Sequence, residues 1–392
     1  MAKRLAVRTR PRTALVLGAG GVLGAAWMTG ALPAVQERLS RPVGDVDLML
    51  GTSAGSVLTA ALRCGVSIEE MIAFQRGEPI GALAEVGDVH GGAWPRPPRL
   101  RFGSPRLMAS ALMAPHRIHP SVGASAWLPV GRENHHNLRA MVHLLHTQAT
   151  ALHFGPHHDP DARDREGPHH GSGEHHGWSL RHGPGGQQAG LAYGAALTGA
   201  ALPGGAVPGA PVPPPAPAPE GGPHWIDRGQ TWVVAVDYES GERVVFGREG
   251  APRARLADAV VASCSVPGWF EPFVIGGRRY VDGGVRSATS LGLLARTGVQ
   301  EVWVLAPMAS VVADRPREPH KRLERRVRAL LTFALLREVR ALRAAGVEVT
   351  VLTPGPEDLA VMGVNLMDPR RRAAVLETSL GTSPRSLDSR AA

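Results

Sequence analysis

The sequence predicts an α/β fold, in which a mostly parallel central sheet is covered by helices on both faces. Three features indicate this fold. Short apolar runs alternate along the chain with stretches of helical spacing, the runs carry few charges, as do strands buried on both faces, and glycine-rich turns follow several of them directly. The 392 residues are 43% hydrophobic and 20% charged, which supports a large core and excludes a wholly disordered chain.

The first half of the domain is expected over 13–149, after a basic N-terminal tail at 1–12. Strands are expected at 13–18 and 47–50, and helices at 22–39, 54–63 and 137–150. A further helix is predicted to begin after Ser67, because Glu70 follows it at the spacing of a capping box. This order of elements is the start of a parallel sheet with crossover helices.

A low-complexity insertion is predicted at 150–224. Twelve of the 17 histidines lie between 135 and 182, and nine prolines alternate with alanine and glycine between 203 and 223. Such a composition has too few large apolar side chains to offset the loss of chain entropy on folding. We therefore expect this Pro/His-rich insertion to be disordered.

The second half of the domain is expected over 225–382, followed by a C-terminal tail at 383–392. Strands are expected at 231–238, 243–247, 279–281, 301–307 and 347–354, and helices at 256–262 and 319–345. The strands alternate with helical stretches here too, so both halves are predicted to contribute to one sheet.

The charge and the cysteines exclude several classes of protein. The net charge is +9, but lysine occurs only at Lys3 and Lys321, so the basic residues are almost all arginine. Together with the excess of alanine, glycine and proline, this favours a biased composition over a nucleic-acid partner. The only cysteines, Cys64 and Cys264, cannot build a disulfide framework or a cysteine metal cluster.

A nucleophile elbow is predicted at the turn that follows the second strand. Gly51, Ser53 and Gly55 match the pattern G-x-S-x-G between a buried strand and a helix. Small neighbours allow a turn sharp enough to present the serine hydroxyl, and the N-terminus of the following helix favours negative charge nearby. Ser53 is therefore the candidate nucleophile, and the amide of Ala54 is a candidate oxyanion donor.

A glycine-rich loop at 18–24 lies at another strand-to-helix junction. Its backbone amides suit either the oxyanion of a tetrahedral intermediate or the pyrophosphate of a dinucleotide. The first interpretation makes Gly20, Gly21 and Gly24 part of an oxyanion hole. The second requires G-x-G-x-x-G, which has Leu23 in place of its last glycine here.

A third turn joins the other two at the predicted edge of the sheet. Asp282 ends a strand and is followed by Gly283 and Gly284. The carboxyl ends of parallel strands meet at one edge, so Asp282 is expected close to the elbow and the glycine loop.

These motifs, in this order, resemble the patatin-like phospholipase family. A stretch between them, 263–272, is also similar to the family's pattern. The resemblance implies a patatin-like three-layer sandwich and a serine hydrolase that releases fatty acids from phospholipid or other lipid esters. It implies an acyl-enzyme on Ser53, Asp282 as the base of a Ser–Asp dyad, and no metal or cofactor. The family typically carries arginine where this chain has Leu23, and restoring it with Leu23→Arg is expected to leave activity unchanged or raise it.

Three alternatives remain open from the sequence. A nucleotide- or dinucleotide-binding protein would use the loop at 18–24, and an α/β-hydrolase triad would add His320 to Ser53 and Asp282. A non-catalytic scaffold or metal buffer would rest on Leu23 and the histidine-rich tract.

The expected partner is a lipid ester, in a protein that is cytoplasmic or peripheral to a membrane. The arginine-rich helix at 319–345 is suited either to pack on the sheet or to lie on anionic lipid. No oligomeric state follows from the sequence. An acyl-chain pocket would need large apolar side chains, for which the sequence offers Phe74, Trp94, Phe102 and Trp127.

Overall fold

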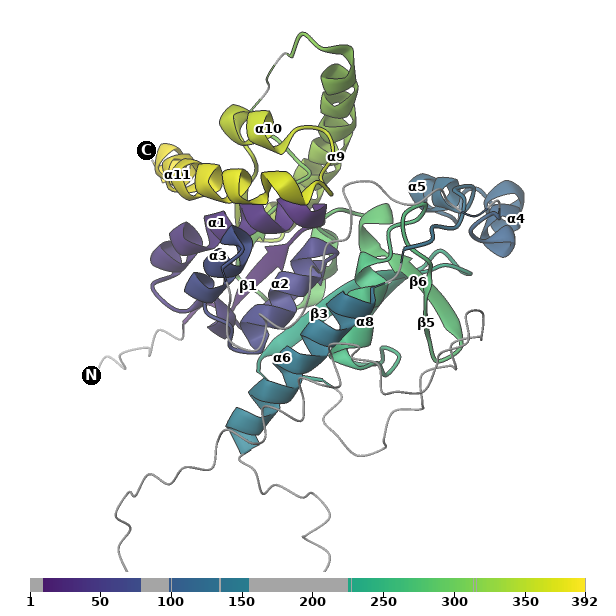
Figure 1. The fold of residues 1–392 in the computed structure, drawn as a ribbon, viewed down its shortest axis with the longest axis horizontal. Coiled ribbons are helices and arrows are strands. Elements are labelled where there is room, and N and C mark those ends of the chain that lie inside the picture. The colour runs from purple at the N-terminus through teal and green to yellow at the C-terminus, as the bar shows by residue number, and fades with distance from the viewer. Residues whose placement is uncertain are drawn as a thin grey trace, which may run out of the picture.

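A computed structural model describes residues 10–78, 99, 101–133, 135–154, 225–226, 228–312, 314 and 316–391. Within these residues the chain forms one eight-stranded sheet in the order β5-β6-β3-β2-β1-β7-β8, with β4 paired to β3. Figure 1 shows the sheet at the centre of the molecule with helices packed around it.

The strands alternate with helices along the chain, as the sequence predicts. The strands are β1 (Thr13–Leu17), β2 (Leu48–Thr52), β3 (Gln230–Asp237), β4 (Arg243–Phe246), β5 (Phe273–Ile275), β6 (Arg278–Asp282), β7 (Glu301–Leu305) and β8 (Glu348–Leu352). The longer helices are α1 (Gly21–Leu39), α2 (Ala54–Arg63), α3 (Ile68–Arg76), α4 (Pro105–Met113), α5 (Pro120–Ser125), α6 (His136–Phe154), α8 (Leu256–Cys264), α9 (Pro319–Ala344), α10 (Pro356–Met362) and α11 (Arg372–Ala391).

The centre of the sheet is parallel and one end is antiparallel. β1 pairs in parallel with β2 on one side and with β7 on the other. β2 in turn pairs in parallel with β3, and β7 pairs in parallel with β8. β4, β5 and β6 run antiparallel to their neighbours. The expected α/β class with a mostly parallel sheet is therefore confirmed.

Both faces of the sheet are buried, which explains the continuous apolar runs. Leu15 and Leu17 of β1 point to one face and pack with α1, α2 and α8, whereas Ala14 and Val16 point to the other and pack with α9. Successive side chains in a strand point to opposite faces, so every residue of β1 is buried.

The structure refines several element boundaries. Ser67 and Glu70 form the predicted capping box at the start of α3. α6 continues to Phe154, so the first residues of the segment predicted as an insertion are helical, and 155–224 lies outside the described residues. In the N-terminal segment 1–12, the described Arg12 donates to the Thr297 carbonyl at 2.8 Å.

The prediction of a C-terminal tail at 383–392 is wrong, because α11 extends to Ala391. This helix packs along α1 (Figure 1). The contact is close because Gly30 of α1 faces Ser379, whose hydroxyl donates to the Trp27 carbonyl at 2.7 Å. Val375 and Leu387 of α11 are buried in the same core cluster as α1. Ser379 and Ser383 lie between them, so polar residues interrupt the apolar stripe of this helix.

Within the described ranges, no helix combines the length and the apolar character needed to cross a bilayer.

Candidate active site

Ser53 occupies a strained turn between β2 and α2. Its backbone has φ 54° and ψ −124°, a conformation that residues other than glycine rarely adopt. The flanking glycines permit the turn. A Cβ on Gly51 would lie 2.5 Å from the Cα of Ser56, and one on Gly55 would lie 1.9 Å from the Leu17 carbonyl oxygen.

The elbow is also held by the stretch 263–272 that the sequence analysis singled out. The Ser53 amide donates to Oγ of Ser263 at 2.9 Å, and that hydroxyl donates to the Val234 carbonyl at 2.6 Å. The last turn of α8 therefore connects the elbow to β3. Ser53 itself is 5% exposed.

Asp282 lies at the carboxyl end of β6, opposite Ala235 of β3. The Ser53 hydroxyl favours the carboxylate form of Asp282, and Oδ1 of Asp282 accepts a hydrogen bond from the Gly284 amide at 2.6 Å. A Cβ on Gly283 would lie 2.4 Å from the Val234 carbonyl oxygen, so this turn too requires glycine. The structure thus brings Ser53 and Asp282 together from opposite sides of the insertion.

Burial perturbs the acidity of this carboxyl group. Asp282 is 4% exposed, and the loss of solvent raises its pKa from 3.8 to about 6. The Ser53 hydroxyl and the Gly284 amide oppose this shift because they favour the carboxylate. The result is a carboxyl group that can gain and lose a proton near neutral pH.

The glycine loop offers two free backbone donors next to the elbow. Among the described residues, the amides of Gly20 and Gly21 reach no acceptor, and the same holds for Ala54 at the start of α2. Gly21 has φ 61° and lines the same cavity as Ser53 and Ala54. The N-termini of α1 and α2 therefore meet at one place, where both favour negative charge.

Gly24 does not join this set, which corrects its assignment to the oxyanion hole. Its amide donates to the Gly20 carbonyl at 2.9 Å, so it is already engaged within the first turn of α1. Gly24 instead allows close packing, because a Cβ there would lie 3.1 Å from Cγ of Pro307.

Leu23 belongs to the core rather than to the surface of the site. Its side chain is 0% exposed, and its amide donates to the Leu366 carbonyl at 3.0 Å. Leu23→Arg would place a charged group in this apolar core, which is strongly unfavourable without a partner. The structure therefore argues against the expectation that this substitution is harmless.

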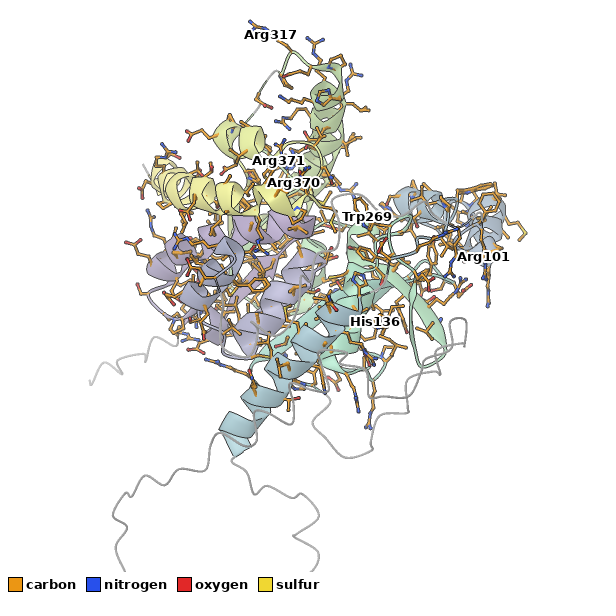
Figure 2. All side chains as sticks on the ribbon, in the orientation of Figure 1. Arg101, His136, Trp269, Arg317, Arg370 and Arg371 are labelled. Atoms are coloured by element: carbon orange, nitrogen blue, oxygen red, sulfur yellow. The ribbon has the colours of Figure 1, made fainter. Side chains whose placement is uncertain are left out.

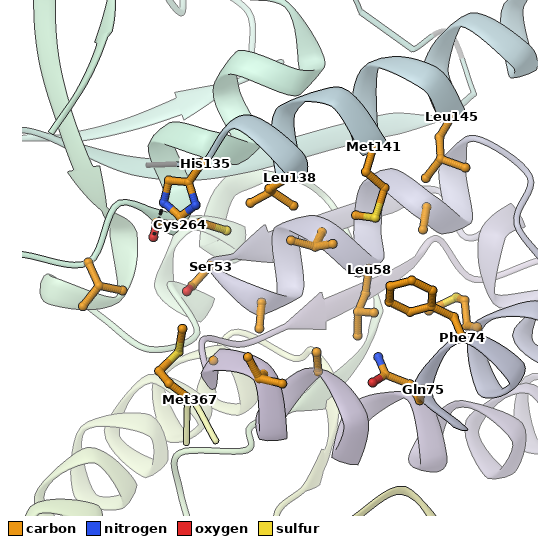
Figure 3. Close-up of a pocket in the computed structure, with 18 of the residues that line it drawn as sticks. Ser53, Leu58, Phe74, Gln75, His135, Leu138, Met141, Leu145, Cys264 and Met367 are labelled. Carbon is orange, nitrogen blue, oxygen red and sulfur yellow. Dashed lines mark hydrogen bonds between the residues drawn. The ribbon is translucent and has the colours of Figure 1, made fainter. Parts of the chain in front are cut away.

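A cavity of about 170 Å³ opens beside Ser53 and extends between α2, α3 and α6 (Figure 3). Its lining is mainly apolar, and one helix face contributes Leu138, Met141 and Leu145 of α6 at helical spacing. The remaining apolar lining includes Ala25, Val57, Leu58, Ala61, Val66, Met71, Phe74, Val266 and Met367. This acyl-sized groove is what an apolar substrate would require.

His135 lines the cavity beside Ser53, and the sequence analysis did not identify it. Its ring stacks on Phe270 with centroids 3.8 Å apart, and its Nε2 lies 3.1 Å from the Cys264 carbonyl oxygen (Figure 3). A carbonyl only accepts, so Nε2 carries the proton. Burial lowers the pKa of His135 to about 4, so the ring is neutral at pH 7. The sequence offered no reason to choose His135, because it is one of many histidines in the same stretch.

The side chains predicted for an acyl-chain pocket, and His320, lie in different parts of the structure. Phe74 lines the cavity as expected. Phe102 and Trp127 do not line it; they are exposed and contact each other edge to face, with centroids 6.2 Å apart. Trp94 lies outside the described residues. His320 is exposed near the start of α9 and does not line the cavity.

No cluster of three or more metal-ligating side chains occurs in the ranges that the structure describes. Most of the histidine-rich tract lies in the segment 155–224, beyond those ranges.

A serine on a strained strand-to-helix turn, beside a buried carboxyl group and an apolar cavity, is typical of serine hydrolases. A family model narrows this class: the model of patatin-like phospholipases matches residues 15–162 and 226–295. The chain therefore belongs to the patatin-like phospholipase family, and this membership supports a lipid hydrolase.

Two solved structures resemble the chain at low identity. VipD from Legionella pneumophila is 14% identical, with a TM-score of 0.39, over 97% of this chain and 67% of its own. The type III effector protein ExoU is 13% identical, with a TM-score of 0.37, over 97% of this chain and 53% of its own. The chain thus spans about two thirds of VipD and about half of ExoU. No curated protein matches it by sequence.

Proposed function

We propose that this protein hydrolyses the ester bonds of phospholipids or other lipid esters through an acyl-enzyme on Ser53, with Asp282 as the base. The observation that carries the proposal is a buried carboxyl group of raised pKa, whose carboxylate form the Ser53 hydroxyl favours, beside an apolar cavity that Ser53 lines.

In the first step, Oγ of Ser53 attacks the ester carbonyl carbon while Asp282 takes the hydroxyl proton. The carbonyl oxygen becomes an oxyanion, which the free amides of Gly20, Gly21 and Ala54 are suited to bind. The intermediate then collapses, the C–O bond to the alcohol breaks, and the alcohol leaves with the proton from Asp282.

In the second step, a water molecule attacks the acyl-enzyme. Asp282 takes a proton from the water, a second oxyanion forms at the same amides, and the bond to Oγ breaks as Ser53 regains its proton. The products are a free fatty acid and the deacylated lipid. The raised pKa of Asp282 makes the carboxylate a better base than an exposed aspartate.

The structure of the site also disfavours two alternatives from the sequence, a Ser–Asp–His hydrolase and a dinucleotide-binding protein. A Ser–Asp–His triad needs a histidine in contact with the aspartate, but His320 is exposed and His135 bonds to the Cys264 carbonyl instead. A dinucleotide would need a polar cleft beside the glycine loop, whereas the cavity there is mainly apolar.

The test is the release of fatty acid from phosphatidylcholine in mixed micelles by the wild type and by Ser53→Ala. We expect the substitution to lower the rate at least about 10³-fold, because a nucleophile cannot be replaced by its neighbours. Circular dichroism of both proteins checks that the fold is intact. Comparable rates in two folded proteins would exclude Ser53 as the nucleophile.

We further infer that α9 contacts an anionic membrane surface. Its buried residues begin only at Arg328, so the preceding turns project from the fold, and Figure 2 shows Arg317 at this projecting end. The Arg328 guanidinium donates to the Pro307 carbonyl at 2.6 Å, and Pro307 packs against the glycine loop. The projecting turns therefore extend beyond the edge that holds Ser53.

The exposed side of α9 is amphipathic in the way that lipid surfaces require. Leu323 is 64% exposed and Leu330 is 71% exposed, and Arg322 and Arg326 are exposed beside them. Apolar side chains can enter the interface while arginines pair with lipid phosphates.

The corresponding measurement is cosedimentation with phosphatidylglycerol vesicles. Replacing both Leu323 and Leu330 with serine is expected to weaken binding at least about tenfold, because two leucines each contribute roughly 1.5–3 kcal/mol when buried. Hydrolysis of soluble p-nitrophenyl acetate should not change. Unaltered vesicle binding by the folded variant would refute the membrane contact.

A further inference from the structure

Two polar side chains of α3 interrupt the apolar lining of the cavity, the exposed Glu70 and the buried Gln75. Gln75, in the last turn of α3, lines the cavity and is 4% exposed. Among the described residues its Oε1 has no hydrogen-bond partner. Figure 3 shows Ser53 and the carboxamide of Gln75 toward opposite ends of the cavity, with Leu58 and Phe74 close to the carboxamide.

The fold itself gives no reason for a glutamine at this position. The Gln75 carbonyl accepts from Nε of Arg372 at 2.9 Å, but that bond uses the main chain and would form with any side chain. Burying an amide without a hydrogen-bond partner destabilises the folded protein. Methionine would fill a similar volume without this penalty, and Met71 already does so one turn earlier on the same lining.

The distance from the nucleophile fits the far part of an acyl chain. Ser53 directly precedes α2, and Leu58 and Ala61 of α2 also line the cavity. The cavity therefore follows α2 for about two turns, which is about 12 Å at 1.5 Å per residue. An acyl chain whose carbonyl lies at Ser53 would reach Gln75 with its distal carbons.

The carboxamide of Gln75 favours particular chemical groups on the distal part of an acyl chain. It both donates and accepts, so a hydroxyl can pair with either of its ends. A second carboxylate is disfavoured, because Glu70 lines the same cavity.

We propose that Gln75 is a specificity-determining residue, which selects acyl chains that carry a hydroxyl group toward their distal end. The proposal rests on the proposed function, since it assumes that the cavity beside Ser53 holds the acyl chain. A net hydrogen bond of about 0.5–1.5 kcal/mol corresponds to a preference of roughly two- to tenfold.

The test compares p-nitrophenyl esters in pairs: decanoate with 10-hydroxydecanoate, and dodecanoate with 12-hydroxydodecanoate. The wild type should hydrolyse the hydroxylated ester of at least one pair with a kcat/KM about fivefold higher. Gln75→Met should reverse this preference. Met71→Leu, an apolar exchange in the same lining, should change both rates together and keep their ratio.

Two results would overturn the proposal: equal or lower kcat/KM for the hydroxylated ester in both pairs, or a preference that survives in Gln75→Met. If Gln75→Met does not fold, the wild-type comparison decides alone. Displacement of a fluorescent fatty acid from Ser53→Ala by decanoic and 10-hydroxydecanoic acids separates this proposal from the proposed function. It measures the preference without hydrolysis, and tighter binding of the hydroxy acid would support Gln75 even if Ser53 were not the nucleophile.

Discussion

The two ends of the cavity are built in different ways. At the catalytic end, Ser53 and Asp282 are held by main-chain turns at the ends of β2 and β6, and each turn depends on glycines that pack against neighbouring backbone. At the far end, the lining consists of side chains from α2, α3 and α6, which lie in separate parts of the chain. Geometry is therefore fixed by the backbone at one end and by side-chain packing at the other.

The difference extends to stability. The catalytic end contains two unfavourable features, a positive φ at Ser53 and a buried carboxylate at Asp282. The far end consists mainly of apolar side chains whose burial stabilises the fold, with Glu70 and Gln75 as its polar residues. Substitutions of Ser53 and Asp282 should thus reduce activity without reducing stability, and substitutions at the far end should change selectivity.

Asp282→Asn gives the largest expected effect. We expect a loss of activity similar to that of Ser53→Ala, at least about 10³-fold, because the members of a dyad act as a unit. His320→Ala serves as the control and should retain near-normal rates with p-nitrophenyl butyrate. An inactive but folded His320→Ala protein would favour a triad instead.

The same carboxyl group links activity and stability to pH in opposite directions. Activity requires the carboxylate, so kcat/KM should fall about tenfold per pH unit below the pKa of about 6. A raised pKa means that the protonated form favours folding. The stabilisation is complete below 3.8 and is lost as the pH rises through about 6.

This shift of about two pKa units corresponds to about 3 kcal/mol. Asp282→Asn removes the charge and should therefore raise the free energy of unfolding at pH 8 by up to that amount. Chemical denaturation at pH 8 measures the difference. A variant less stable than the wild type would contradict the assigned cause of the pKa shift.

Met141→Trp is expected to separate the channel from the chemistry. Met141 lines the middle of the cavity, and a larger side chain there should exclude long acyl chains. The ratio of kcat/KM for p-nitrophenyl decanoate to that for p-nitrophenyl acetate should fall roughly 10- to 100-fold, since each buried CH₂ contributes about 0.8 kcal/mol. Equal losses on both esters would mean that the cavity does not hold the acyl chain.

The smallest expected effect is a difference in the free energy of unfolding that comes from backbone strain at Ser53. Ser53→Gly and Ser53→Ala should both be inactive, but the glycine variant should be more stable by about 1 kcal/mol, because glycine adopts a positive φ without steric strain. Urea denaturation of the two variants provides the comparison. Higher stability of the alanine variant would show that the turn relaxes.

The sequence predicted that Ser53, Asp282 and the glycine loop lie at one edge of the sheet, but of the lining at the far end of the cavity it predicted only Phe74. Strand-to-helix turns with glycines are local patterns, so Ser53, Asp282 and the free amides of the glycine loop could be placed from a few neighbouring residues. The channel depends on which helix faces meet in space. His135 and Gln75 are therefore visible only in the fold, because nothing near them in the sequence distinguishes them from surface residues.

Helix packing limited the prediction of the fold in a similar way. α11 contacts α1 through Ser379 at Gly30 and contains Pro384, so its apolar periodicity from Val375 to Leu387 is interrupted by polar residues and a helix breaker. The buried position of Leu23 was equally hidden, since an apolar residue in a glycine loop can face either the core or the site.

The most direct test of the account is labelling with a fluorophosphonate probe, followed by peptide mass spectrometry. We expect one covalent adduct, on Oγ of Ser53, which is absent in Ser53→Ala and forms much more slowly in Asp282→Asn. Decanoic acid should slow labelling of the wild type by occupying the cavity. A folded wild-type protein that takes up no probe, or an adduct on another residue that persists in Ser53→Ala, would contradict the assignment of Ser53 as the nucleophile.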